Sequence, residues 1–146
     1  MTLWDYALVA WTRPGVSEVC LQLQNQHGQC VALLLWRAWA TTEGRQVSGS
    51  TARRAINLAR LRESEIIAPL RAARRALAGA PEGVEAARAA ELDAERALLE
   101  ALEALTPPAA GVRFGGLAPG LATLMAAWNG SRIDALAGAL ASALRR

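Results

Sequence analysis

The chain has 146 residues, of which 53% are hydrophobic, and a formal net charge of +3, so it is too apolar for a disordered protein and too short for a multidomain enzyme. Alanine and leucine supply 33 and 22 residues against four isoleucines, a composition typical of helices. The longest apolar run, residues 30–36, is too short to span a bilayer, and the first residues lack the basic segment of a signal peptide, so we expect a cytoplasmic, all-α protein.

The first 44 residues are predicted to form a core of three helices. Apolar side chains recur at the spacing of one helical face in residues 3–11 and again in residues 16–26, and Gly28 favours a left-handed end to the second helix. Residues 30–42 are apolar on every side apart from Arg37, as in a helix that others surround. Four of the five tryptophans lie in this part of the chain: Trp4, Trp11, Trp36 and Trp39. We therefore predict a rigid, Trp-rich core within residues 1–44.

A basic and an acidic helix are predicted to form a long antiparallel hairpin within residues 51–105. The basic helix reaches about residue 78 and should kink or restart at Pro69, which cannot donate a hydrogen bond to the carbonyl of Glu65. The acidic helix covers residues 84–105 and follows a turn at residues 80–83. Residues 45–75 carry eight arginines against two glutamates, and residues 82–105 carry seven acidic residues against two arginines. These net charges of +6 and −5 favour pairing of the two helices.

Two further helices, within residues 117–146, complete one predicted domain that spans residues 1–146. A loop rich in proline and glycine precedes them and includes residues 111–116. The glycine-rich segment 115–120 lacks the Lys-Ser/Thr pair of a phosphate-binding loop. The first of the two helices covers residues 118–128, and Ser131 is predicted to cap the second. The predicted fold class is an all-α, compact, single-domain bundle of six or seven helices with a long charged antiparallel hairpin.

The residues capable of metal or nucleophilic chemistry are few and widely spaced. Cys20, His27 and Cys30 offer three ligands, whereas structural zinc requires four in tight pairs. We therefore expect reduced cysteines, with Cys20 in the core, and neither a metal nor a cofactor. Asp5 and Glu18, the only acidic residues among the first 42, suit helix N-termini. Because no catalytic group can be assembled from the sequence, we favour a protein that is not an enzyme.

Nucleic-acid binding is not expected, although the sequence has a pI near 9.6 and a cluster of arginines within residues 53–75. All 16 basic residues are arginines, and the absence of lysine is unusual for a surface that follows phosphates. An acidic helix of similar length is available to neutralise the basic one. The second helix of the helix-turn-helix pattern in residues 21–39 offers no polar side chain to a base edge at residues 31–36.

Short motifs in the first 105 residues carry a family resemblance. They are Trp4-Asp5, Arg-Pro-Gly-Val at 13–16, Cys-Leu-Gln-Leu-Gln at 20–24, His27-Gly28, Leu-Leu-Leu-Trp at 33–36 with Trp39, Pro-Leu-Arg at 69–71 with Arg74-Arg75, and Glu91-Leu92 with Glu95. With these motifs the sequence resembles an uncharacterised bacterial family of short helical proteins, known only as a domain of unknown function. Cys30 departs from the acidic residue expected there. The resemblance implies a helical fold and no particular activity.

Three arginines on one helical face form the first candidate site. Arg71, Arg74 and Arg75 are three and four residues apart, and their charges require acidic partners, either Glu91 and Glu95 or residues of another molecule. The surplus of apolar and Ala-rich helical surface favours contact with another protein or with a second copy of the chain. We therefore predict a non-enzymatic protein–protein interaction or adaptor module.

The alternative is a small-molecule or acyl-chain binding protein with a pocket among the tryptophans. Gln22 and Gln24 flank Leu23 and project from different sides of their helix. The candidate pocket residues are Trp4, Trp11, Gln22, Trp36 and Trp39. A cavity lined by these tryptophans favours a ligand, whereas an exposed apolar groove on the hairpin favours a partner protein.

Overall fold

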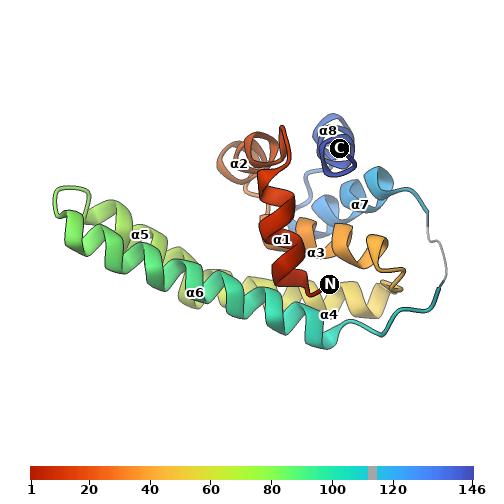
Figure 1. Ribbon diagram of the computed structural model, residues 1–146, viewed down its shortest axis with the longest axis horizontal. Helices are drawn as coiled ribbons and strands as arrows, with labels where there is room; N and C mark the ends of the chain where they lie inside the picture. Colours follow the sequence, from red (N-terminus) through yellow and green to blue (C-terminus); the bar gives the residue numbers. More distant parts are fainter. Residues whose placement is uncertain (112–114) are drawn as a thin grey trace.

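Helices joined by short connections make up most of the computed structural model, which describes residues 1–111 and 115–146 (Figure 1). They are α1 (Leu3–Thr12), α2 (Val16–His27), α3 (Val31–Thr42), α4 (Gly49–Arg62), the π-helical segment η1 (Glu63–Ile67), α5 (Ala68–Ala76), α6 (Pro81–Leu105), α7 (Leu117–Asn129) and α8 (Asp134–Leu144). Because α4, η1 and α5 continue without a break, the described residues form seven helical rods, which confirms the predicted all-α bundle.

Helix α3 lies at the centre of the fold. Figure 1 shows it with α1 in front, the hairpin of α4, η1, α5 and α6 below it, and α7 and α8 above. Trp36 and Trp39 are completely buried, and their indole N–H groups donate hydrogen bonds to Thr106 Oγ1 (2.7 Å) and the carbonyl of Met1 (3.0 Å). Only two of the predicted core tryptophans therefore lie in the core; Trp4 is partly buried and Trp11 is exposed.

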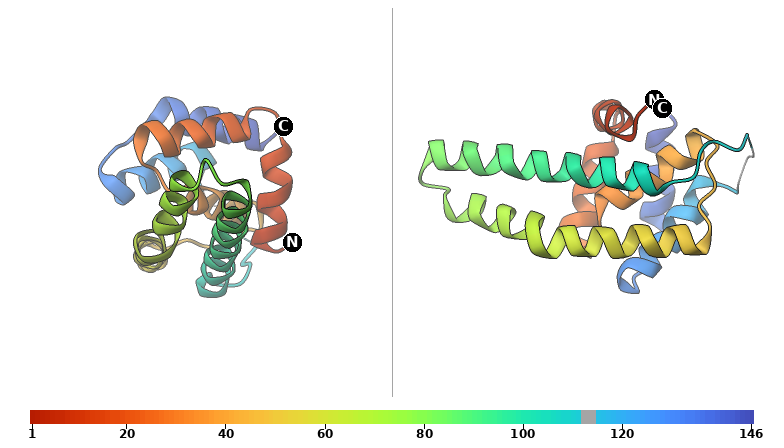
Figure 2. Two further views of the ribbon diagram at one scale, coloured as in Figure 1. Left: turned by 90° about the vertical axis from the view of Figure 1, so that its left-hand side faces the viewer. Right: turned by 90° about the horizontal axis from the view of Figure 1, so that it is seen from below.

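The charged hairpin is antiparallel, as predicted. The two arms run side by side along their whole length (Figure 2), with contacts from α4 and α5 to α6. The part that contains α5 and the start of α6 projects beyond the other helices (Figure 1). Helix α6 begins at Pro81 rather than at residue 84, because proline is tolerated in the first turn, where its missing N–H has no partner.

The interruption predicted at Pro69 takes the form of a π-helical turn. Pro69 lies in the first turn of α5, and the N–H of Ala68 donates to the carbonyl of Glu63, five residues back. This register inserts one extra residue into the turn that precedes the proline. The helix continues through the interruption. The residues after η1 are, however, rotated about the helix axis relative to the positions that they would have if a regular α-helix continued from α4.

Local interactions set several helix ends. Thr2 caps α1, because its Oγ1 accepts from the N–H of Asp5 (3.1 Å). Gly28 ends α2 in the predicted left-handed conformation, with φ of 62°. The prediction for Ser131 is wrong: α8 begins at Asp134 without a side-chain cap, and Ser131 instead donates its N–H to Asn129 Oδ1. Within the predicted loop at 111–116, residues 112–114 lie outside the described residues. In the part of the chain that is described, no helix has the length and apolar character needed to cross a membrane.

Candidate functional site

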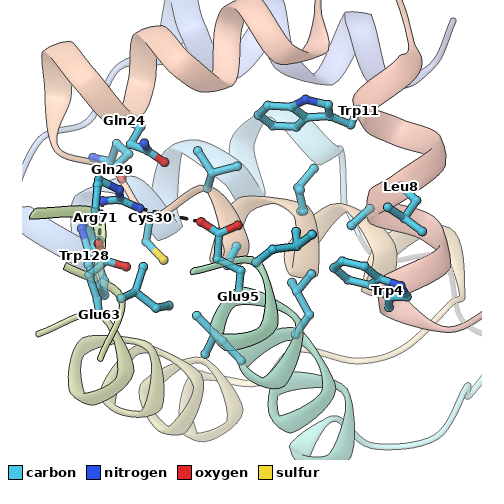
Figure 3. A pocket seen from close by; sticks show the side chains of 18 of the residues that line it. Trp4, Leu8, Trp11, Gln24, Gln29, Cys30, Glu63, Arg71, Glu95 and Trp128 are labelled. Carbon is cyan, nitrogen blue, oxygen red and sulfur yellow. Dashed lines mark hydrogen bonds and ion pairs between the residues drawn. The ribbon is translucent and has the colours of Figure 1, made fainter. Parts of the chain in front are cut away.

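A pocket of about 630 Å³ lies between α1, α3 and the middle of the hairpin (Figure 3). Its walls are mainly apolar side chains from three helices. The lining includes Trp4, Leu8 and Trp11 from α1, Val31, Ala32 and Leu35 from α3, and Leu92, Leu98 and Leu99 from α6. Leu8, Trp11 and Leu92 are 51%, 41% and 52% exposed, so the apolar walls continue to the surface.

Charged side chains from both arms of the hairpin line the same pocket. Glu63 of η1, Arg71 of α5 and Glu95 of α6 all lie in its lining. Arg71 Nη1 is 3.0 Å from Glu63 Oε1, and Arg71 Nη2 is 3.8 Å from Glu95 Oε1. Behind them, Glu91 accepts from Arg71 Nε at 3.2 Å and from Arg74 Nε at 2.7 Å. We call these five residues the ion-pair cluster.

The two glutamates of α6 in the cluster differ in their electrostatic environment. Burial favours the neutral form of Glu91, but the hydrogen bonds from Arg74 and Arg71 outweigh it and hold its pKa below the usual range. Glu95 is open to solvent through the pocket, although protein surrounds most of its carboxyl group. Partial burial and the neighbouring charge of Glu91 raise the pKa of Glu95. The two arginines therefore favour the ionised form of Glu91, whereas burial and the charge of Glu91 disfavour the ionised form of Glu95.

The π-helical turn explains how Glu63 reaches Arg71. Residues eight positions apart in a regular α-helix lie about 80° apart around the axis. The extra residue in η1 removes most of this rotation and allows Glu63 and Arg71 to form their ion pair. Ile67 of the same segment also lines the pocket. The interruption caused by Pro69 thus positions an acidic and an apolar side chain at the site.

The structure brings only part of the predicted pocket together. Trp4 and Trp11 line it, with Glu95 between them and Arg71 in Figure 3. Trp36 and Trp39 do not, because α3 is surrounded by other helices and packs both rings into the core. Gln22 is exposed and lies outside the lining.

The glutamine that lines the pocket from α2 is Gln24. Two residues correspond to about 200° of rotation along a helix, so Gln22 and Gln24 point in different directions.

The three candidate arginines have different environments. Arg71 and Arg74 belong to the ion-pair cluster and bind Glu91 of the same chain. Arg75 is exposed on the surface of α5. The acidic partners that the sequence left open for Arg71 and Arg74 are thus provided by α6 and, unexpectedly, by Glu63.

Sequence reasoning did not identify several lining residues. Trp128 of α7 is held at the pocket by a hydrogen bond from its indole N–H to the carbonyl of Gly28 at 2.9 Å. The two residues are 100 positions apart in the sequence. Nothing in the sequence assigned Leu92, Leu98 and Leu99 of α6 to a pocket either. Cys30 lines the pocket as a free thiol, and burial raises its pKa to about 12, so it is protonated at neutral pH. Cys20 is also free and lies in the core, as predicted.

Comparison with known proteins identifies a family but no function. A model of the family described as "Protein of unknown function (DUF2390)" matches residues 2–102. This confirms the resemblance to an uncharacterised domain family. The matched span contains every residue of the pocket lining except Trp128. No curated protein and no solved structure matches the chain.

Proposed function

We propose that this chain, which belongs to the DUF2390 family of proteins of unknown function, binds a small amphipathic molecule between α1, α3 and the hairpin. The pocket itself carries this proposal. Its volume of about 630 Å³ falls within the range of roughly 300–1,000 Å³ that is usual for small-molecule sites. Apolar walls with a few ionisable groups on one side are also typical of such sites.

The exposed apolar residues at the edge of the pocket support the same proposal. Leu8, Trp11 and Leu92 are each about half exposed to water, which is unfavourable for large apolar side chains that meet at one place. A ligand with an apolar body would cover them. Burying this surface would supply most of the affinity, and the ionisable groups would determine orientation and specificity.

A neutral fluorescent probe can test the pocket without involving the ion-pair cluster. Phenylnaphthylamine is expected to bind one molecule per chain, with an increase in fluorescence. In the Ala32→Phe variant, the added ring would occupy the space beside α3 and abolish binding. The matched control Ala89→Phe places the same ring on the exposed surface of α6 and should bind like the native protein. Circular dichroism would verify that both variants are folded. Failure of the native protein to bind the probe, or equal binding by the Ala32→Phe variant, would contradict the proposal.

Protein–protein interaction is the second candidate function. The observation that favours it is the projecting part of the hairpin, where α5 buries none of its residues and Leu77 remains 38% exposed. Arg75 adds a charged group on the same segment. An adaptor function predicts that a tagged chain recovers one stoichiometric protein from its host, and that Arg75→Gln together with Leu77→Gln abolishes this recovery. Unchanged recovery by the double variant would contradict docking on this segment.

A further inference from the structure

We infer that the ligand of this pocket is an organic cation, with an ammonium group held by Glu63 and Glu95 and an apolar body packed against Trp4 and Trp11. The inference rests on the proposed function, because it specifies the chemical class of ligand for the same site. Three observations support the inference: the charge balance of the ion-pair cluster, the accessibility of its glutamates from the pocket, and the aromatic rings on the opposite side of the pocket.

The cluster contains more negative than positive charge. Within residues 1–111 and 115–146, the ion pairs of Glu63, Glu91 and Glu95 are formed with Arg71 and Arg74 alone, which leaves the cluster with one uncompensated negative charge when all five groups are ionised. A cation that enters the pocket would neutralise this excess. An anion would increase it, in surroundings whose apolar walls strengthen electrostatic interactions relative to water.

Accessibility also favours a cation. The side chains of Glu63 and Glu95 are 29% and 42% exposed, whereas that of Arg71 is only 15% exposed. The guanidinium of Arg71 already donates to Glu63 and Glu91. A carboxylate ligand would have to displace one of these glutamates, and the displaced charge would remain in the pocket without its partner.

Glu95 is the group best suited to bind the ammonium. It lies 3.8 Å from Arg71, beyond hydrogen-bond distance, and no hydrogen bond to its carboxylate is formed within residues 1–111 and 115–146. Figure 3 shows this carboxylate in the middle of the pocket, between Arg71 on one side and Trp4 and Trp11 on the other. Partial burial raises the pKa of this carboxyl group, and the charges of Glu91 and Glu63 add to the increase, whereas Arg71 and Arg74 lower it. A bound ammonium would offset the repulsion and supply the missing hydrogen-bond donor.

The tryptophans provide aromatic surface for the rest of the ligand. Indole rings attract cations over their faces and also bury apolar groups. Two tryptophans of the lining already contact cations of this chain: Arg96 lies 5.1 Å from the ring centre of Trp4, and Arg60 lies 5.6 Å from that of Trp128. Arg96 is itself paired with Glu100 at 2.9 Å, so its charge does not oppose a ligand cation at full strength.

Three probes with one alkyl chain and different head groups separate the contributions. Octylammonium, octanol and octanoate are titrated into the native protein by isothermal calorimetry. We expect octylammonium to bind at least about tenfold more tightly than octanol, in keeping with a charge-assisted contact in a partly desolvated site, and octanoate to bind most weakly. In the Glu95→Gln variant, octylammonium affinity should fall about tenfold while octanol affinity stays unchanged. The matched control Glu85→Gln, which removes one charge from an exposed position of α6, should change neither.

The outcomes distinguish this inference from the proposed function. Equal or tighter binding of octanoate, or an unchanged octylammonium affinity in the Glu95→Gln variant, would overturn the cation inference and leave the pocket as an apolar binding site. Lack of binding by all three probes would also overturn it. If phenylnaphthylamine fails to bind as well, the proposed function fails with it. Thermal unfolding of each variant would show that any loss of affinity occurs in a folded protein.

Discussion

Arg71 is the residue that holds the polar side of the pocket together, because its guanidinium binds Glu63 of η1 and Glu91 of α6 at the same time. The Arg71→Gln variant would leave Glu63 without its cationic partner and Glu91 with Arg74 alone. We expect its free energy of unfolding to fall by roughly 2–4 kcal/mol, somewhat less than for a fully buried pair. Urea unfolding followed by circular dichroism measures this change.

Arg75 provides the control on the same helix. Its side chain is exposed, and the free energy of unfolding of Arg75→Gln should stay within about 0.5 kcal/mol of the native value. Equal destabilisation by the two variants would show that the loss reflects positive charge on α5 in general. It would then contradict the role assigned to the ion pairs of Arg71.

Glu95 should reduce stability at neutral pH. Its pKa in the folded chain lies above the ordinary value of 4.5, so the folded protein binds the proton of this carboxyl group more tightly than the unfolded chain does. The stability that the protonated group provides is therefore fully present below the unfolded-state pKa and is lost as pH rises through the folded-state pKa. The Glu95→Gln variant should therefore be more stable than the native protein near neutral pH. The gain should be less than about 1 kcal/mol, because the carboxylate remains partly solvated.

The gain is measured by thermal unfolding at neutral pH and again in acid, below the ordinary glutamate pKa. In acid the native carboxyl is protonated, and the two proteins should then be nearly equal in stability. Glu91→Gln should behave in the opposite way and be less stable at neutral pH, because the lowered pKa of Glu91 stabilises the fold until pH falls through it. A Glu95→Gln variant less stable than the native protein at neutral pH would contradict this assignment.

At the level of elements, α5 and α3 represent two extremes of burial. Seven residues of α3 are buried, whereas α5 has none and is joined to α6 by the ion pairs of Arg71 and Arg74 with Glu91. We expect the amides of α5 to exchange with solvent through local opening of the hairpin, and those of α3 only through global unfolding. Amide hydrogen exchange resolved by residue tests this difference.

Salt provides an internal check on the same measurement. The ion pairs of α5 are partly exposed, so high ionic strength should screen them and accelerate exchange in α5 while leaving α3 unchanged. Exchange of α5 as slow as that of α3, or independent of salt, would mean that the projecting part of the hairpin is held by interactions other than those described.

Most helices could be predicted because their signals are local. Apolar spacing located α1 and α2, and Gly28 gave the end of α2 through its positive φ. Pro69 predicted an interruption, but not that it would be a π-helical turn, because its register depends on how both flanking segments pack against α6. Ser131 fits the composition of a cap, yet its neighbour Asn129 binds its N–H instead.

At the scale of the whole molecule, the pocket was only partly predictable. Spacing identifies an apolar face but cannot tell whether that face meets another helix or a cavity. Trp4 and Trp11 therefore looked equivalent to Trp36 and Trp39, although only the first two line the pocket. Trp128 and the ion pair between Glu63 and Arg71 depend on the tertiary fold and, for the ion pair, on the geometry of η1.

The tryptophans also provide the most direct test of the central claim. The chain has five of them, and each indole N–H gives a separate signal in a nitrogen–proton correlation spectrum. Titration with octylammonium should shift the signals of Trp4 and Trp11, which line the pocket, and leave those of Trp36 and Trp39, which are buried and hydrogen-bonded within the core, in place. Absence of any shift, or shifts of Trp36 and Trp39 without those of Trp4 and Trp11, would contradict binding in this pocket.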